Sequence, residues 1–314
     1  MRAYFTGETK EALSRVPLRS RHCRLAELHG LILGIGEIEV LPGGRLSLLI
    51  QSENLPAVRR AEYLIYVLSG LEVDVSVFLG GRDRTPLYSL SLMGGRPLGR
   101  LLKALGFLSS RGALRDKALP APEALLERDC CRRAYLRGAF LSSGYISDPG
   151  RAYHWELLCP GLARGEEVQG VLEKLGIRGR LTLRKGRDLL YVKDSGAISD
   201  LLNLMGATVS LLEWENARAF RSLQGQVNRQ VNCETANLEK TTLASAQQRQ
   251  AIRKIEEKQG LSSLPGPLRE MALLRLEHPE ASLTELGAML DPPVGRSGIN
   301  HRLRKLMKLA EELS

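Results

Sequence analysis

Residues 129–149 read DCCRRAYLRGAFLSSGYISDP, and this stretch decides the fold. Its centre, residues 136–144, mixes apolar and small residues and ends on a glycine before a strand-like run. Residues 23–38, CRLAELHGLILGIGEI, form a second copy that aligns without a gap. Eight of the sixteen aligned positions are identical: Cys23/Cys131, Arg24/Arg132, Ala26/Ala134, Leu28/Leu136, Gly30/Gly138, Leu33/Leu141, Gly36/Gly144 and Ile38/Ile146. A repeat at this separation predicts two related lobes and not a short-period solenoid.

The small residues of both copies predict closely packed helices. Gly30 and Gly34 lie one helical turn apart in the first copy, as do Gly138 and Ser142 in the second. Small side chains at this spacing let two helix backbones approach each other. Ordinary core helices would explain the individual glycines. The similarity of the whole strings favours a pseudo-twofold pair of helices.

Both copies resemble the LAGLIDADG helix of homing endonucleases, through residues 28–36 and 136–144. In that family the penultimate position of the motif is a carboxylate that holds the metal ions for DNA cleavage. Here the position is Ile35 in one copy and Ser143 in the other. Two-metal cleavage needs hard, preferably charged, oxygen ligands. We therefore expect helices that keep their packing surface but provide no catalytic residues, no metal site and no cofactor.

The sequence after each copy of the repeat predicts the same order of secondary-structure elements. Hydrophobic alternation and glycine turns, among them Gly80-Gly81, indicate two strands, a helix, two strands and a closing helix. We predict an α+β fold with two pseudo-symmetric αββαββα LAGLIDADG-like lobes, followed by an all-α helix-turn-helix domain. The predicted boundaries are 1–110 for the first lobe, 111–128 for a linker, 129–215 for the second lobe, 216–260 for a helical bridge and 261–314 for the helix-turn-helix domain.

The C-terminal residues predict three short helices. Pro267 suits the first position of one helix, and Ser282 with Glu285 forms the capping-box signature of the next. Ser297 is expected to cap the third. Apolar residues recur along this third helix at spacings of four and three, which predicts a buried face: Ile299, Leu303, Leu306 and Leu309.

A basic third helix headed by small polar residues is typical of a helix-turn-helix. Some of its side chains are predicted to read base edges: Ser297, Asn300, His301 and Arg304. Others are predicted to contact phosphates: Arg302, Lys305 and Lys308. The alternative is a small helical cap whose basic face is only solvated. Secondary DNA contacts are predicted in the helical bridge, at Asn228, Arg229 and Asn232, and on a hairpin of the second lobe, at Arg184 and Lys185. Exposure to solvent alone would also explain polar residues at these positions.

Two strings resemble the WhiA family of bacterial regulators: residues 228–237, NRQVNCETAN, and residues 282–306, SLTELGAMLDPPVGRSGINHRLRKL. The resemblance extends over the lobes as well. It implies a transcription regulator built on a degenerate homing-endonuclease scaffold and linked to sporulation, cell division, the cell cycle and chromosome segregation. It also implies double-stranded DNA, at promoters or in the nucleoid, as the partner, with other transcription or division proteins as further partners.

Composition agrees with a polyanionic partner. The chain of 314 residues carries a net charge of +10, and a basic balance favours nucleic acid. The first residues lack the apolar core of a signal peptide, and no apolar run approaches the ~20 residues of a membrane span. We therefore expect a cytoplasmic, nucleoid-associated protein without a membrane partner. Five cysteines without a C-x-x-C pair predict reduced, buried thiols, not a zinc site or disulfides.

The sequence is also compatible with two other functions. The first is a metal-dependent endonuclease of the LAGLIDADG type that uses other acids. Glu37 and Asp148 lie just past the two motifs, but at unequal distances, which disfavours a symmetric metal pair. The second is a double lobe that serves only as a platform for protein partners.

Overall fold

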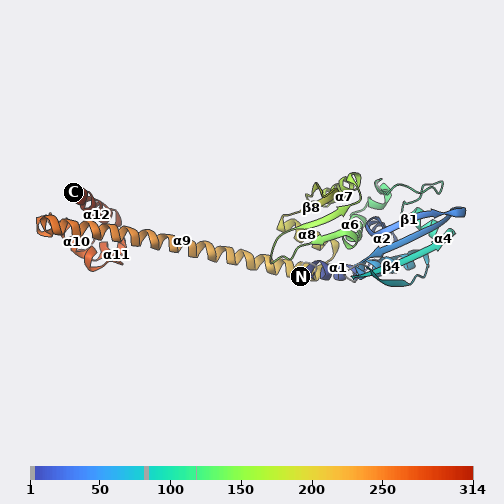
Figure 1. Cartoon of the computed structure of the whole chain (residues 1–314), viewed down its shortest axis with the longest axis horizontal. Coiled ribbons are helices and arrows are strands. Elements are labelled where there is room, and N and C mark those ends of the chain that lie inside the picture. Colours follow the sequence, from blue (N-terminus) through green and yellow to red (C-terminus); the bar gives the residue numbers. More distant parts are fainter. Residues whose placement is uncertain (1–3, 81–84, 118, 314) are drawn as a thin grey trace. The chain divides into compact units, whose positions relative to one another are not determined.

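Two hydrophobic cores divide the chain. The computed structural model describes residues 4–80, 85–117 and 119–313. Its two compact units are Met1–Arg221 and Ser222–Ser314 (Figure 1). Each unit has its own cluster of buried apolar side chains. Among the described residues, no helix is both long enough and apolar enough to cross a membrane.

The first lobe follows the predicted order. A short helix that was not predicted, α1 (Tyr4–Ser14), precedes it. The lobe then consists of α2 (Arg21–Ile35), β1 (Gly36–Leu41), a 3-10 turn η1 (Pro42–Gly44), β2 (Arg45–Ser52), α3 (Leu55–Ser69), β3 (Val75–Gly80), β4 (Thr85–Gly94) and α4 (Arg96–Ala104). The strands pair antiparallel in the order β1-β2-β4-β3. The turn predicted at Gly80 and Gly81 extends outside the described residues.

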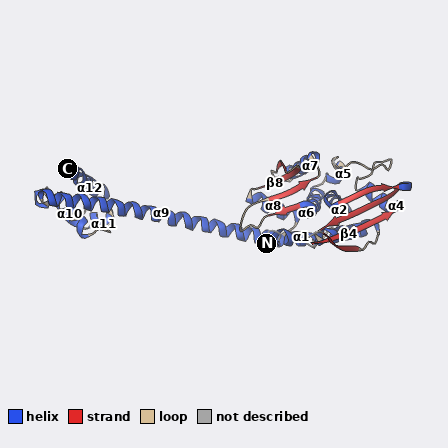
Figure 2. Ribbon diagram, in the orientation of Figure 1, coloured by secondary structure: helices blue, strands red, loops and turns tan. Residues whose placement is uncertain are grey.

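The second lobe repeats this topology. After a short helix α5 (Glu123–Leu126) come α6 (Asp129–Ser143), β5 (Gly144–Ile146), β6 (Trp155–Cys159), α7 (Leu162–Lys174), β7 (Arg180–Arg184), β8 (Arg187–Val192) and α8 (Ser195–Met205). The strand order is β5-β6-β8-β7, again antiparallel. Figure 2 shows both sheets in red. The pseudo-symmetric αββαββα fold is therefore confirmed.

The repeat helices α2 and α6 pack against each other along their length (Figure 1). A methyl group on Gly30 would lie 2.5 Å from the carbonyl oxygen of Tyr135, and one on Gly138 would lie 2.0 Å from that of Glu27. Both distances are far below van der Waals contact. The two glycines therefore let the backbones touch, as the repeat predicted.

A buried ion cluster links these helices to their neighbours. Glu27, on α2, is fully buried and accepts hydrogen bonds from Arg60 of α3 at 2.5 Å and Arg137 of α6 at 2.6 Å. Arg60 also donates to the carbonyls of Ser14 and Val16, and Arg137 to that of Met205. Since a buried charge without partners is strongly destabilising, this arrangement fixes how the helices meet.

The described residues of the C-terminal unit form helices joined by turns. The predicted bridge is part of a single helix, α9 (Thr208–Gln259). A 3-10 turn η2 (Leu261–Ser263) leads to α10 (Gly266–Glu277), α11 (Leu283–Ala288) and α12 (Arg296–Glu312). The end of α9 contributes Ile252 and Ile255 to the core of this unit, where α12 buries Ile299, Leu303 and Leu306.

One helix start was predicted correctly and one was not. The Ser282–Glu285 capping box is present on α11. The expectation that Ser297 caps the third helix is wrong, because α12 begins at Arg296 and Gly295 is its N-cap. The carbonyl of Gly295 accepts the first helical hydrogen bond, from the Ile299 amide at 3.1 Å. Ser297 therefore lies in the first turn.

We predict that Gly138→Ala destabilises the double lobe by about 1–3 kcal/mol, because the added methyl group forces α6 away from α2. Both tryptophans, Trp155 and Trp214, are buried in this unit, so tryptophan fluorescence during urea unfolding measures its stability selectively. Gly170→Ala on α7, where the methyl group meets open space, is the matched control and is expected to be neutral or mildly stabilising. Equal stabilities of the two variants would contradict the close helix contact.

Candidate nucleic-acid interface

The α11–turn–α12 segment is held together by a close backbone contact. The amide of Val294 donates to the carbonyl of Gly287 at 2.9 Å. A methyl group on Gly287 would lie 2.1 Å from the carbonyl oxygen of Val294. Only glycine fits between α11 and the turn, and this contact sets the direction in which α12 leaves the turn.

Four of the predicted contact residues form a row on α12. Ser297, His301, Arg304 and Lys308 recur at i, i+4, i+7 and i+11, and all four are exposed. This spacing places them on one face of the helix, opposite the buried apolar face. The row presents a hydroxyl, an imidazole, a guanidinium and an ammonium group, all of which can donate hydrogen bonds to base edges or phosphates.

The other three predicted residues lie on the flanks of α12. Asn300 is half-buried and lines a polar groove of about 350 Å³, together with Arg296 and with Lys240 of α9. Arg302 is also half-buried and has its guanidinium 3.9 Å from the carboxylate of Glu270 on α10. Lys305 is exposed. Asn300 and Arg302 are therefore less accessible than the other five predicted residues, which are all exposed.

The predicted secondary contacts belong to two different units. Asn228, Arg229 and Asn232 are exposed on the part of α9 that belongs to the helical unit. Arg184 and Lys185 are exposed at the turn between β7 and β8 of the second lobe.

The outer face of the second sheet carries further residues that the sequence reasoning missed. The strand register aligns Arg180, Tyr191 and Glu156 across three strands. Lys193 lies 5.3 Å above the ring of Tyr191, and the His154 imidazole is 2.7 Å from the Glu156 carboxylate. Period-two alternation could have found this face, because inward-facing Trp155 and Leu157 flank Glu156.

The ends of α2 and α6 provide no metal ligands at the two positions where the nuclease motif requires them. Ile35 offers only a hydrocarbon side chain, and the Ser143 hydroxyl donates to the carbonyl of Leu158 at 2.9 Å. The ammonium of Lys117 instead donates to the carbonyl of Gly36, next to Ile35. Burial lowers the pKa of Lys117, and the neighbouring Glu37 acts in the opposite direction. A protein cation thus lies at the end of α2.

The two acids considered for an alternative nuclease differ in their surroundings. Glu37 is exposed on β1, where it is paired with Leu49 of β2. Asp148 lies in the turn after β5 and accepts a hydrogen bond from the Gly150 amide at 2.8 Å. The two carboxylates therefore lie in different local environments.

Family models match both parts of the chain: the WhiA LAGLIDADG-like domain at residues 132–224 and the WhiA C-terminal HTH domain at residues 227–310. A "Probable cell division protein WhiA" from Heliobacterium modesticaldum is 40% identical over 99% of this chain and 97% of its own length. The chain belongs to the WhiA family. A relative of the same name from Lachnoclostridium phytofermentans is 37% identical over 98% of this chain and 99% of its own length.

A solved WhiA structure has the same architecture. Full-length DUF199/WhiA from Thermatoga maritima superposes with a TM-score of 0.59 at 27% identity, and the match covers 98% of each chain. The WhiA HTH model begins within α9, so Asn228, Arg229 and Asn232 lie inside the matched helical domain. The WhiA LAGLIDADG-like model begins within α6, the second of the repeat helices.

We predict that Gly287→Ala destabilises the helical unit by about 1–3 kcal/mol, because the methyl group would overlap the carbonyl of Val294. This unit has no tryptophan, so its unfolding is measured by far-UV circular dichroism, while tryptophan fluorescence reports on the lobes. Gly266→Ala, at the open start of α10, is the control and should leave both signals unchanged. A Gly287→Ala chain as stable as that control would show that the turn tolerates a side chain.

Proposed function

We propose that this chain is a DNA-binding transcription regulator of the WhiA type whose LAGLIDADG-like double lobe does not cleave DNA. The observation that carries the proposal is the exposed row of hydrogen-bond donors on α12, opposite its buried face, in a helix-turn-helix of this family. In a helix-turn-helix, the second helix of the motif, here α12, reads the major groove through exposed polar residues in its N-terminal half.

Each side chain of the interface has a role set by its chemistry. Arg304 offers the bidentate donor pair that matches guanine, while Ser297 and His301 reach base edges from the preceding turns. Asn300, on the flank of α12, has a side-chain amide that can form paired hydrogen bonds with adenine. Lys305 and Lys308 add affinity by contacting phosphates, and Arg302 joins them where its weak contact with Glu270 opens.

The relatives' names give this regulator a cellular setting. They are called probable cell division proteins. We infer that this chain acts on double-stranded DNA in the cytoplasm, at promoters or in the nucleoid. Its targets would be genes of cell division, the cell cycle, chromosome segregation and sporulation, with other transcription or division proteins as further partners.

Secondary DNA contacts are proposed on both units. Exposed Asn228, Arg229 and Asn232 supply polar groups along α9. On the second lobe, Arg184 and Lys185 extend a face that also carries Tyr191 and Lys193. A basic surface with an aromatic ring suits phosphates and bases alike.

Cleavage by the nuclease mechanism is disfavoured by the two motif ends. Hard divalent cations need oxygen ligands in a fixed arrangement. Ile35 and Ser143 do not supply them, and the Lys117 ammonium beside Gly36 would repel an incoming cation.

We predict that Arg304→Ala weakens binding to a selected duplex by ~1–3 kcal/mol and relaxes preference at one base pair. The measurement is fluorescence anisotropy on duplexes chosen from genomic fragments by the full-length chain. With about five phosphates neutralised, log affinity should fall with log salt at a slope of roughly −4 to −5.

Lys305→Ala is the matched comparison for Arg304→Ala. It should weaken binding to all duplexes alike and reduce the salt slope by about 1. If Arg304→Ala also weakened all duplexes equally, Arg304 would be a phosphate contact. If neither variant changed affinity, α12 would not be the DNA-binding element.

We predict that the full-length chain leaves supercoiled plasmid intact in Mg²⁺ or Mn²⁺ under conditions where it binds the DNA. Agarose gels measure the nicked fraction over time, and the Glu37→Ala chain is run beside it. Metal-dependent nicking that disappears in Glu37→Ala would establish the endonuclease alternative and overturn the proposed function.

A further inference from the structure

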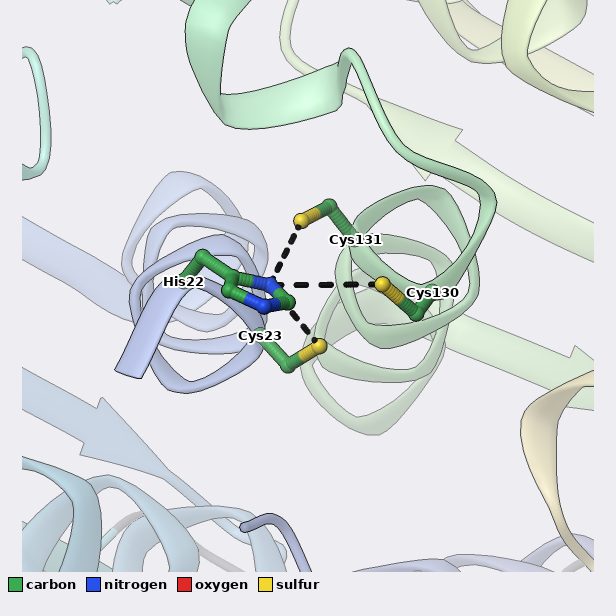
Figure 3. Close-up of side chains that lie close together, drawn as sticks. All are labelled: His22, Cys23, Cys130 and Cys131. Carbon is green, nitrogen blue, oxygen red and sulfur yellow. Dashed lines mark hydrogen bonds between the residues drawn. The ribbon is translucent and has the colours of Figure 1, made fainter. Parts of the chain in front are cut away.

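Four potential metal ligands meet where α2 and α6 begin. His22 and Cys23 come from the first turn of α2, and Cys130 and Cys131 from the first turn of α6. Their donor atoms all lie within 4.8 Å of one another. Figure 3 shows the four side chains pointing toward a common centre from the two helices.

The repeat explains why the four residues meet. The alignment of the two helices places Cys23 on Cys131 and His22 on Cys130. Each lobe thus contributes one adjacent pair from equivalent positions. Since Gly30 and Gly138 bring the two backbones into contact, the first turns also come together. Sequence spacing alone conceals this cluster, because its members are close only across the lobe interface.

The distances within the cluster suit a tetrahedral ion. The Nδ1 atom of His22 lies 3.2 Å from the sulfur atoms of Cys23 and Cys131, and 4.0 Å from that of Cys130. Zinc bonds of about 2.3 Å to sulfur and about 2.0 Å to nitrogen imply ligand-to-ligand distances of roughly 3.5–3.8 Å. The observed values lie on both sides of this range, so small side-chain adjustments would seat an ion.

We propose that His22, Cys23, Cys130 and Cys131 form a structural zinc site that fastens the first lobe to the second. Three thiolates and one imidazole are the donor set of a closed structural zinc site. Soft sulfur ligands select zinc over magnesium, calcium or manganese. This site is therefore chemically unlike the metal centre of the nuclease motif.

The proposed site is also distant from the nuclease position. Cys23 and Ile35 are separated by twelve residues of one helix, or roughly 18 Å at about 1.5 Å per residue. A metal ion at the start of the helices says nothing about cleavage, and the proposal is independent of DNA binding.

The electrostatic surroundings favour a metal-thiolate centre. A zinc ion with three thiolates carries a net negative charge, and both helix N-termini present the positive end of the helix dipole to it. Arginines flank both pairs in the sequence, at positions 21, 24, 128 and 132. Cys23 and Cys131 are buried whereas Cys130 is exposed, which leaves one side open for the ion to enter.

A disulfide is the competing use of these cysteines. All of them are free thiols in the structure. A bond between two sulfur atoms would use only part of the cluster and would give the His22 ring no role. A bound zinc ion uses all four donors, which is why the metal site is the stronger inference.

The test measures the zinc content of the full-length chain by inductively coupled plasma mass spectrometry after purification under reducing conditions. About one Zn²⁺ per chain is expected. Replacement of zinc by Co²⁺ should give the intense visible bands of tetrahedral cobalt and a thiolate-to-cobalt charge-transfer band. Cys130→Ser, at an exposed position, should lose most of the bound zinc and the charge-transfer intensity.

Cys233→Ser is the matched control, because Cys233 is an exposed thiol on α9 outside the cluster. It should retain zinc and the cobalt spectrum. Tryptophan fluorescence of both variants checks that the lobes are folded. The proposal is overturned if the unsubstituted chain binds no more zinc or cobalt than Cys130→Ser. It is also overturned if intact-mass analysis of the chain as purified, without exposure to a chelator, finds a disulfide within the cluster.

Discussion

The contact of α2 with α6 at Gly30 and Gly138 is the constraint on which the double lobe depends. It places two helix backbones closer than any side chain would allow. The buried Glu27 carboxylate forms ion pairs with Arg60 of the first lobe and Arg137 of the second lobe. The sheets follow from this pairing, because each begins at the glycine that ends its repeat helix.

The close packing of α2 against α6 is present without the carboxylates that the nuclease motif uses for metal binding. At their C-terminal ends, the two helices carry Ile35 and Ser143 in place of carboxylates. Both residues are half-buried: Ile35 packs against the hydrophobic core, and the Ser143 hydroxyl donates to the carbonyl of Leu158. The ammonium of Lys117 now lies near one of these ends. At the opposite ends, the same pairing gathers the cysteine–histidine cluster. The helical unit, which carries the proposed DNA-binding surface of α12, has a separate hydrophobic core.

Much of this was predictable from local patterns. The repeat, the order of elements in each lobe, the capping box at Ser282 and the apolar face of α12 all depend on residues close in sequence. Three features were not. The Glu27 cluster joins residues from three helices, and the cysteine–histidine cluster joins residues across the lobe interface. The start of α12 was misplaced because Gly295 adopts the extended conformation that a serine cap would otherwise supply.

The most direct test of the central claim is hydroxyl-radical footprinting of protein side chains, read by mass spectrometry, with and without bound duplex DNA. His301 on α12 and Phe78 and Met93 on the first sheet are exposed and readily labelled. If α12 binds the DNA and the first sheet serves as scaffold, DNA lowers the labelling of His301 and leaves Phe78 and Met93 unchanged. Protection of Phe78 and Met93 with His301 unaffected would contradict the account.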